Sequence, residues 1–260
     1  DSVVSTNSMF LNASSFDQDL NAWNLSADTS VAGMFRGASS FNGIIGAWDM
    51  ASSVRDASGM FRDATSFNGD ISLWDMSNIT NVRAMFQGAS SFNQNISGWD
   101  LSAVVSTARM FMYNPAFNQD IGSWDLSAVQ DMNSMFWGAS SFDQDIGLWD
   151  VSSVTNMSNM FRDASAFNQN LARWDVSSVA SMASMFRGAS SFNQNLSLWC
   201  VSQFSVAPIN FASSSGLSSS NYPVWGTCTS NLNPNNAYVN SRGCLVCDQY
   251  AAGDWFSLDS

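Results

Sequence analysis

Six aspartates occupy one recurring position of this sequence, each directly after a tryptophan. We call them the aspartate row: Asp49, Asp75, Asp100, Asp125, Asp150 and Asp175. If the segments that carry them stack in parallel, neighbouring carboxylates lie about 4.8 Å apart. At that spacing each pair repels by roughly 0.8 kcal/mol even in water. Bound cations, arginine, backbone donors or raised pKa values must then offset the repulsion.

Two interpretations of the aspartate row remain open. The functional one is a cation-dependent or sugar-contacting face, with all six aspartates as candidate cation ligands. The structural one is a solvated strand face, or side chains that hydrogen bond to their own turns. The glycine-rich nonapeptide pattern of calcium-loaded β-rolls is absent, and threonine is too sparse for an ice-binding array.

The composition excludes much catalytic chemistry. The chain of 260 residues has 21 acidic and 9 basic residues, a net charge of −12 and no histidine; every acidic residue is Asp and every basic residue is Arg. No imidazole base, lysine Schiff base or P-loop is therefore available. A glycosidase needs one special carboxylate pair about 5–10 Å apart, whereas here such pairs belong to the repeat itself. We expect no enzyme, no cofactor, no nucleic-acid partner and no membrane span.

The elements that position the row come from an internal repeat of 25 residues. Eight Met-Phe pairs, eight later phenylalanines and eight tryptophans recur in step, from Met9 to Trp199. Within one copy, Trp149 to Ser152 alternates apolar and polar residues, which predicts a half-buried strand. Met157, Met160, Phe161 and Ala164 have the spacing of one helical face, which predicts a short helix. Such a unit can bury its apolar face only against stacked copies.

The full pattern, nearly intact from Trp149 to Gln169, resembles the BspA-type surface-protein repeat, a relative of leucine-rich repeats found in bacterial and protist surface proteins. The resemblance covers roughly residues 1–202. It implies a secreted or surface-anchored protein without enzymatic activity, often tied to adhesion. Asn24 and Cys200 depart from the pattern by replacing the aspartate, and Pro115 interrupts the helical stretch of one copy.

The four cysteines all lie at or beyond the last repeat, at Cys200, Cys228, Cys244 and Cys247. An even number in a terminal segment predicts two disulfides in an oxidising compartment, with three possible connectivities. A bridge from Cys200 would fasten the terminal segment to the final strand. The alternative is a zinc site, suggested by the spacing of Cys244 and Cys247.

Several surface features also have two interpretations. Arginines directly after Met-Phe predict a partial row that pairs with Asp63 or Asp163; this arginine row is Arg36, Arg62, Arg162 and Arg187. Met112 and Trp137 take the same slot in other copies and are either contact residues or ordinary exposed apolar residues. Six glycosylation motifs, which chance alone would also produce in so Asn- and Ser-rich a chain, occur at Asn12, Asn24, Asn78, Asn95, Asn156 and Asn195.

We therefore predict a solenoid, a leucine-rich-repeat-like right-handed stack of strand plus short helix. It has about eight 25-residue coils with one parallel β-sheet in residues 1–202, and an irregular disulfide-bonded cap in residues 203–260. Aromatic residues of the cap either pack on the last coil or bind a partner: Tyr222, Trp225, Tyr238, Tyr250, Trp255 and Phe256. The expected function is an extracellular or cell-surface adhesion module that binds a protein or glycan. The alternative is a filament subunit that stacks end to end with copies of itself, because the chain starts in mid-repeat.

Overall fold

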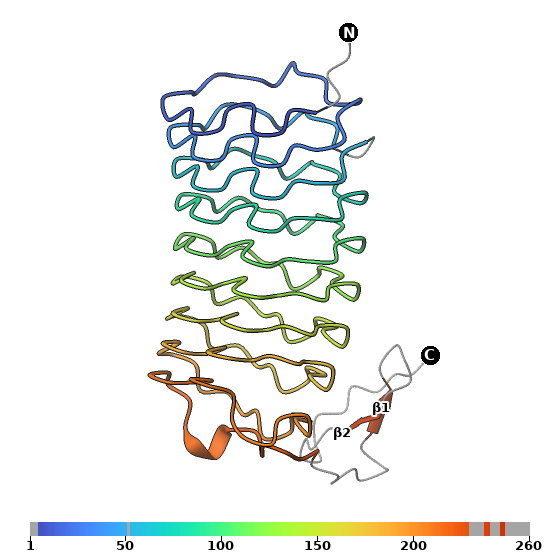
Figure 1. Cartoon of the computed structure of the whole chain (residues 1–260), viewed down its shortest axis with the longest axis vertical. Coiled ribbons are helices and arrows are strands. Elements are labelled where there is room, and N and C mark those ends of the chain that lie inside the picture. Colours follow the sequence, from blue (N-terminus) through green and yellow to red (C-terminus); the bar gives the residue numbers. More distant parts are fainter. Residues whose placement is uncertain (1–4, 51–52, 229–236, 240–244, 248–260) are drawn as a thin grey trace, which may run out of the picture.

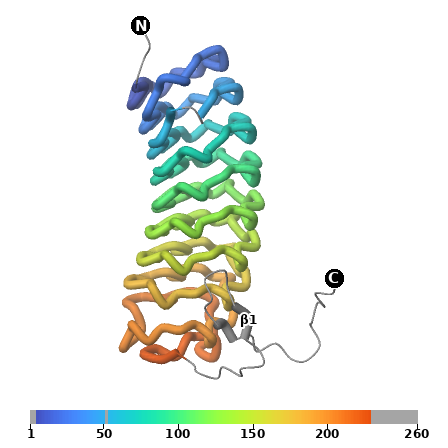
Figure 2. The backbone as a smooth tube through the Cα atoms, turned by 90° about the vertical axis from the view of Figure 1, so that its right-hand side faces the viewer, coloured from blue at the N-terminus to red at the C-terminus, as the bar shows by residue number. Residues whose placement is uncertain are grey.

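The computed structural model describes residues 5–50 and 53–228, with two short strands beyond them. Residues 5–228 run in successive circuits of about 25 residues that lie one above another along the long axis (Figure 1). The view from the side shows the same stack, with the two ends of residues 5–228 at opposite ends (Figure 2). We call one circuit a coil. The strands β1 (Ala237–Val239) and β2 (Leu245–Cys247) pair antiparallel with each other.

The repeated apolar residues fill the interior of the stack, as their periodicity predicts. Phe136, Phe142 and Trp149 are at most 4% exposed, as are their equivalents in the other inner coils. Because each residue meets its own copy one coil away, like rings stack along the axis. The ring centroids of Phe111 and Phe136 lie 5.7 Å apart with planes 7° from parallel, and those of Phe136 and Phe161 also lie 5.7 Å apart. These offset aromatic stacks run through the core.

Tryptophan at its repeat position does more than fill space. The indole N–H of Trp124 donates to the carbonyl oxygen of Ile96 at 3.1 Å, and that of Trp149 donates to Ile121 at 3.0 Å. The same bond recurs from Trp48 to Trp199, always to a carbonyl of an earlier coil. Each of these carbonyls also accepts the backbone N–H of the tryptophan in its own coil, so a phenylalanine would fill most of the volume but lose the second hydrogen bond, the one that joins the coils. The repeat therefore needs the indole nitrogen.

The backbone differs from the predicted strand and helix. In residues 5–50 and 53–228 the structure has no α-helix, and its regular element is the 3-10 turn η1 (Ser219–Asn221). In the predicted helix the N–H of Met160 donates to Met157, three residues back, while the N–H of Phe161 donates to Met185 in the next coil. Asn159 has a φ of 57°, in the left-handed region that interrupts a helix. The prediction of a helix was wrong, although its four apolar residues are all fully buried.

The coils pair through single-residue parallel bridges rather than through the predicted strand at Trp149–Ser152. The bridges run along one row, which consists of Ser30, Asp56, Asn81, Ser106, Asp131, Asn156 and Ser181. Asn156 follows Trp149 by seven residues, so the pairing position lies beyond the predicted strand. The tryptophan segment turns tightly instead, because Asp150 accepts the N–H of Ser152.

The coil pattern continues past residue 202. The N–H groups of Ser184, Phe186 and Gly188 donate to Ile209, Phe211 and Ser213, just as in earlier coils. Trp225 packs its ring edge-on against Phe211 at 5.0 Å, and Tyr222 also packs against the core. The described part of the predicted cap therefore adds a coil to the stack. The side chain of Tyr238, and Tyr250, Trp255 and Phe256, lie outside what the structure describes.

Candidate binding surface

The aspartate row hydrogen bonds to its own turns. The carboxylate of Asp100 accepts the backbone N–H of Ser102 at 2.9 Å and its hydroxyl at 2.6 Å. Asp75 and Asp125 accept the N–H of the serine two residues on, each at 2.9 Å, and Asp150 and Asp175 accept both the N–H and the hydroxyl. This geometry agrees with the structural interpretation of the row, in which each side chain closes a local turn.

These hydrogen bonds also lower the pKa of two carboxyl groups of the row, those of Asp75 and Asp100. The side-chain hydrogen bond from Ser102, followed by the backbone bond, lowers the pKa of Asp100 below its ordinary value of 3.8. The same two bonds from Ser77 lower the pKa of Asp75, and repulsion from Asp100 is the smallest contribution there. At Asp75, donors from the turn therefore outweigh the repulsion from Asp100.

We expect Asp100→Ala to lower the free energy of unfolding by about 1 kcal/mol at pH 7, since it removes hydrogen bonds that close a turn. A depressed folded pKa stabilises the fold above the unfolded value and ceases to do so as pH falls through the folded pKa. The difference between wild type and variant should therefore shrink below about pH 4. Urea unfolding at pH 7 and pH 3 measures both differences. Asp100→Asn, which keeps a carbonyl acceptor, is the matched control, and an equal loss at both pH values would contradict this role of the carboxylate.

No group of three or more Asp or Cys side chains comes together as a metal site among the described residues. The row thus aligns the candidate cation ligands along the stack without gathering them. The described residues likewise include no helix with the length and apolar character to cross a membrane.

A second polar row joins the coils, at the residue that follows the later phenylalanine of each repeat. The side-chain oxygen Oδ1 of Asn118 accepts the N–H of Asp143 at 2.9 Å and the amide Nε2 of Gln144 at 2.8 Å, both in the next coil. The same contact to the next coil recurs at Asp17, Asn42, Asn68, Asn93, Asp143, Asn168 and Asn193. The Asn or Asp that follows the later phenylalanine of every repeat was the sequence signal for these contacts, which we call the asparagine ladder.

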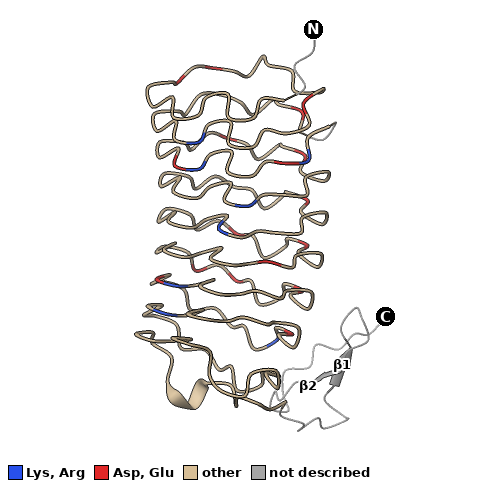
Figure 3. Ribbon diagram, viewed as in Figure 1, with Lys and Arg blue, Asp and Glu red and all other residues tan. Residues whose placement is uncertain are grey.

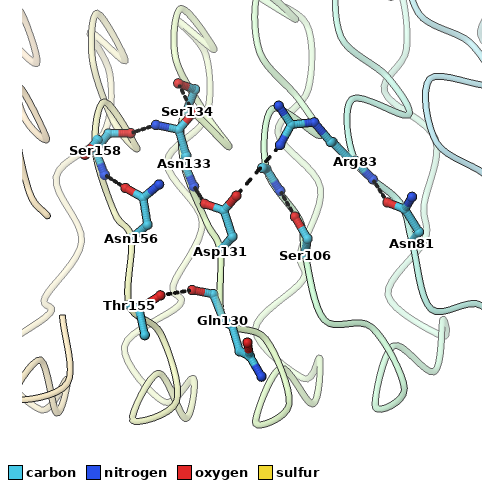
Figure 4. A network of polar contacts seen from close by, with 11 residues as sticks. Asn81, Arg83, Ser106, Gln130, Asp131, Asn133, Ser134, Thr155, Asn156 and Ser158 are labelled. Carbon is cyan, nitrogen blue, oxygen red and sulfur yellow. Dashed lines mark hydrogen bonds and ion pairs between the residues drawn. The ribbon is translucent and has the colours of Figure 1, made fainter. Parts of the chain in front are cut away.

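The bridge row carries further polar contacts (Figure 4). Asp131 accepts the N–H of Asn133 at 3.0 Å and pairs with Arg83, whose Nη1 lies 3.7 Å from Oδ2. Asn133 in turn donates to the carbonyl of Ser158 at 3.0 Å. Arg83 and Asp131 lie two coils apart, so this ion pair passes over the coil that contains Ser106. Many polar side chains in and beside this row thus form contacts within the stack.

Charged residues are unevenly distributed around the stack. Most basic segments lie toward one side and acidic segments line the opposite edge (Figure 3). In the arginine row, Nε of Arg62 lies 3.3 Å from Asp63 and Nε of Arg162 lies 3.5 Å from Asp163, which confirms the two predicted ion pairs. Such exposed pairs contribute little to stability.

The arginine row is interrupted in two adjacent coils by an aromatic cluster. We call Met112, Tyr113, Trp137, Arg162 and Asp163 the aromatic patch. The Tyr113 and Trp137 rings lie 5.2 Å apart, and the Arg162 guanidinium lies 4.2 Å from the centre of the Trp137 ring. The Trp137 indole N–H donates to Asp163 at 3.1 Å. Tyr113 is 48% exposed, while Met112 is only 9% exposed. The sequence indicated Met112 and Trp137 as candidate contact residues but not Tyr113.

The remaining candidate sites divide between described and undescribed residues. Cys200 and Cys228 form a disulfide, one of the pairings open to Cys200. Cys244 and the side chain of Cys247 lie outside the described part. Among the glycosylation motifs, Asn156 is half-buried in the bridge row, and the exposed asparagines are Asn12, Asn24, Asn78, Asn95 and Asn195.

One family model matches this chain, over residues 1–68 and 108–225. Its description is "Mycoplasma protein of unknown function, DUF285". No curated protein and no solved structure gives a significant match. The matched segments contain the repeats at both ends of the stack and extend into the coil closed by the disulfide. Because they make up well over half of the sequence, the chain belongs to the DUF285 family.

Proposed function

We propose that this chain is a non-enzymatic, extracellular or cell-surface repeat protein of BspA type, and that its coils form a solenoid related to leucine-rich repeats. In this proposal it acts as an adhesion or binding module, with a protein or glycan as its partner. The observation that carries the proposal is the aromatic patch, where Met112 and half-buried Trp137 interrupt a row of polar residues and the neighbouring Tyr113 is exposed. Aromatic residues, Met and Arg are the types enriched at the centres of protein interfaces.

The contacts of the other polar rows support this choice of surface. Five residues of the aspartate row, from Asp75 to Asp175, bond to their own serines, and the asparagine ladder bonds from coil to coil. These hydrogen bonds stabilise the stack, which accounts for the polar residues in both rows. In the aromatic patch Trp137 also bonds to the next coil through Asp163, but the core does not require the exposed ring of Tyr113, because Phe111 and Phe136 are already at 0% exposure beneath it.

The disulfide supports the proposed location. Disulfides persist in secreted and surface proteins and are rare in reducing compartments. Cys200 and Cys228 enclose the last described coil, where a staple limits fraying of the stack end. Exposed glycosylation motifs such as Asn12 and Asn95 are compatible with the same location.

Binding by the purified chain tests the proposal directly. We expect saturable binding to at least one member of a panel of immobilised mucins, glycosaminoglycans and extracellular-matrix proteins. Because no carboxylate cluster holds a metal among the described residues, binding should persist in EDTA. The absence of saturable binding to every panel member up to roughly 100 μM would overturn the binding-module proposal.

A second candidate function is a filament subunit, favoured by the first described coil. Met9, Leu11 and Trp23 are 45%, 44% and 38% exposed there. Phe10 stacks on Phe35 at 5.3 Å, while its own side chain is only partly buried. A second copy seated on this coil would extend the stack. Light scattering that finds only monomers at high concentration would exclude this function.

A further inference from the structure

We propose that the aromatic patch is a saccharide-binding site, in which an uncharged sugar ring packs on Tyr113 and hydrogen bonds to the polar groups beside it. This inference rests on the proposed function, because it names the ligand class and the residues through which a binding module would act. It is carried by the departure from the repeat, the backbone conformation of Tyr113 and the fixed arrangement of its neighbours.

The first observation is that the patch replaces polar residues in two adjacent coils. The slot directly after Met-Phe holds Arg62 and Gln87 on one side of the patch and Arg162 on the other, but Met112 and Trp137 between them. Adjacent coils bring Trp137 against Tyr113, the residue that follows Met112, so the two aromatic rings form one continuous surface. The core does not require them, since the phenylalanines beneath are fully buried throughout.

The second observation is that Tyr113 has a φ of 56°, in the left-handed region. A side chain in this conformation costs about 1–2 kcal/mol relative to the right-handed one. The same left-handed slot holds only glycine, asparagine or aspartate in the other repeats, at Gly37, Gly88, Gly138, Gly188, Asn12, Asp63 and Asp163. An exposed aromatic residue in a conformation that suits glycine has no evident structural benefit. Strain of this kind is often retained for function.

The third observation is that the neighbours of Tyr113 are held in place. Trp137 is fixed by its hydrogen bond to Asp163 and by the Arg162 guanidinium above its ring. Gly138 allows the Tyr113 ring to lie across it, because a Cβ there would come within 2.8 Å of the Tyr113 ring atom Cδ1. Rings fixed before binding lose little conformational entropy when a ligand arrives.

The ligand class follows from the mixture of groups. A sugar ring presents one face of C–H bonds, which packs against an aromatic ring, and a rim of hydroxyl groups. Those hydroxyls can donate to the Asp163 carboxylate and accept from Arg162, which lie side by side at 3.5 Å. Because these two charges offset each other, the patch suits an uncharged saccharide better than an acidic one. A purely apolar ligand would leave both charged groups without a role.

A glycan array with neutral, sialylated and sulfated saccharides is the first test, followed by titration of the best ligand. The decisive variant is Tyr113→Gly, because glycine is the repeat's own residue at this slot and suits the left-handed backbone. We expect at least a tenfold loss of affinity, with an unfolding midpoint equal to or above that of wild type. The matched control is Asp63→Gly, the same slot two coils away, which should leave the affinity unchanged.

The other possible outcomes would refute the site, the ligand class or the binding-module proposal. Binding to neutral saccharides that survives Tyr113→Gly would refute the site, and binding confined to acidic saccharides would refute the ligand class. If the chain binds matrix proteins equally well before and after enzymatic deglycosylation and binds no arrayed glycan, the saccharide site fails while the binding-module proposal stands. If it binds neither arrayed glycans nor any member of the immobilised panel, both fail.

Discussion

Replacing Phe136 with alanine should lower the free energy of unfolding by about 3–5 kcal/mol, as large-to-small changes at buried aromatic residues do. Phe136 is fully buried at the centre of the core. Its ring stacks between Phe111 and Phe161, each 5.7 Å away, and lies 4.0 Å from Phe142. The cavity would interrupt the aromatic stack between neighbouring coils. Because the core of each coil packs against the adjacent coils, the loss falls on the interface that joins the two halves of the stack.

Urea unfolding followed by tryptophan fluorescence measures this loss, since Trp124 and Trp149 flank the site. Leu73→Ala is the control, because Leu73 is 88% exposed and its truncation should change the free energy by no more than about 0.5 kcal/mol. A Phe136→Ala variant as stable as the Leu73→Ala control would show that the stacked rings do not hold the coils together.

Removal of the disulfide should have a comparable effect at the other end of the stack. Cys200 and Cys228 are 28 residues apart in sequence. Closing a loop of that length restricts the unfolded chain enough to stabilise the folded state by about 3–4 kcal/mol. We therefore expect the double variant Cys200→Ala/Cys228→Ala to melt roughly 10 °C lower than wild type.

Treatment with a reducing agent distinguishes the effect of this disulfide from that of the other cysteines. It should lower the melting temperature of the wild type to that of the double variant and leave the double variant unchanged. An equal effect of the reductant on both proteins would mean that the stabilising bridge involves other cysteines. The last coil contains Phe211 and Trp225, so the change should appear in aromatic circular dichroism.

The two rows of polar side chains differ in how far sequence reasoning could explain them. Asp100 and Ser102 are two residues apart, so a hydrogen bond that closes their own turn was one of the interpretations that the sequence offered. Asn118 finds its partners 25 and 26 residues away. Local patterns cannot identify such partners, because only the stacking of coils brings the two segments together.

In the aromatic patch, too, some residues can be recognised from sequence and others only from the folded structure. Met112 and Trp137 are recognisable from sequence because they replace a polar residue at a fixed slot. The role of Tyr113 depends on its contact with Trp137, 24 positions later, and on its left-handed backbone. Both facts are properties of the folded stack.

The sequence by itself determined which residues form the core of this protein. Met157, Met160, Phe161 and Ala164 are all buried, as their spacing predicts, because the repeat forces every copy to contribute the same apolar residues. The tertiary structure decided the backbone that carries them. A helix would satisfy the N–H of Phe161 within its own segment, but the stacked neighbour offers the carbonyl of Met185 at 2.9 Å. Once coils supply acceptors to one another, turns at residues such as Asn159 replace the helix, since spacing of side chains alone does not specify where backbone hydrogen bonds go.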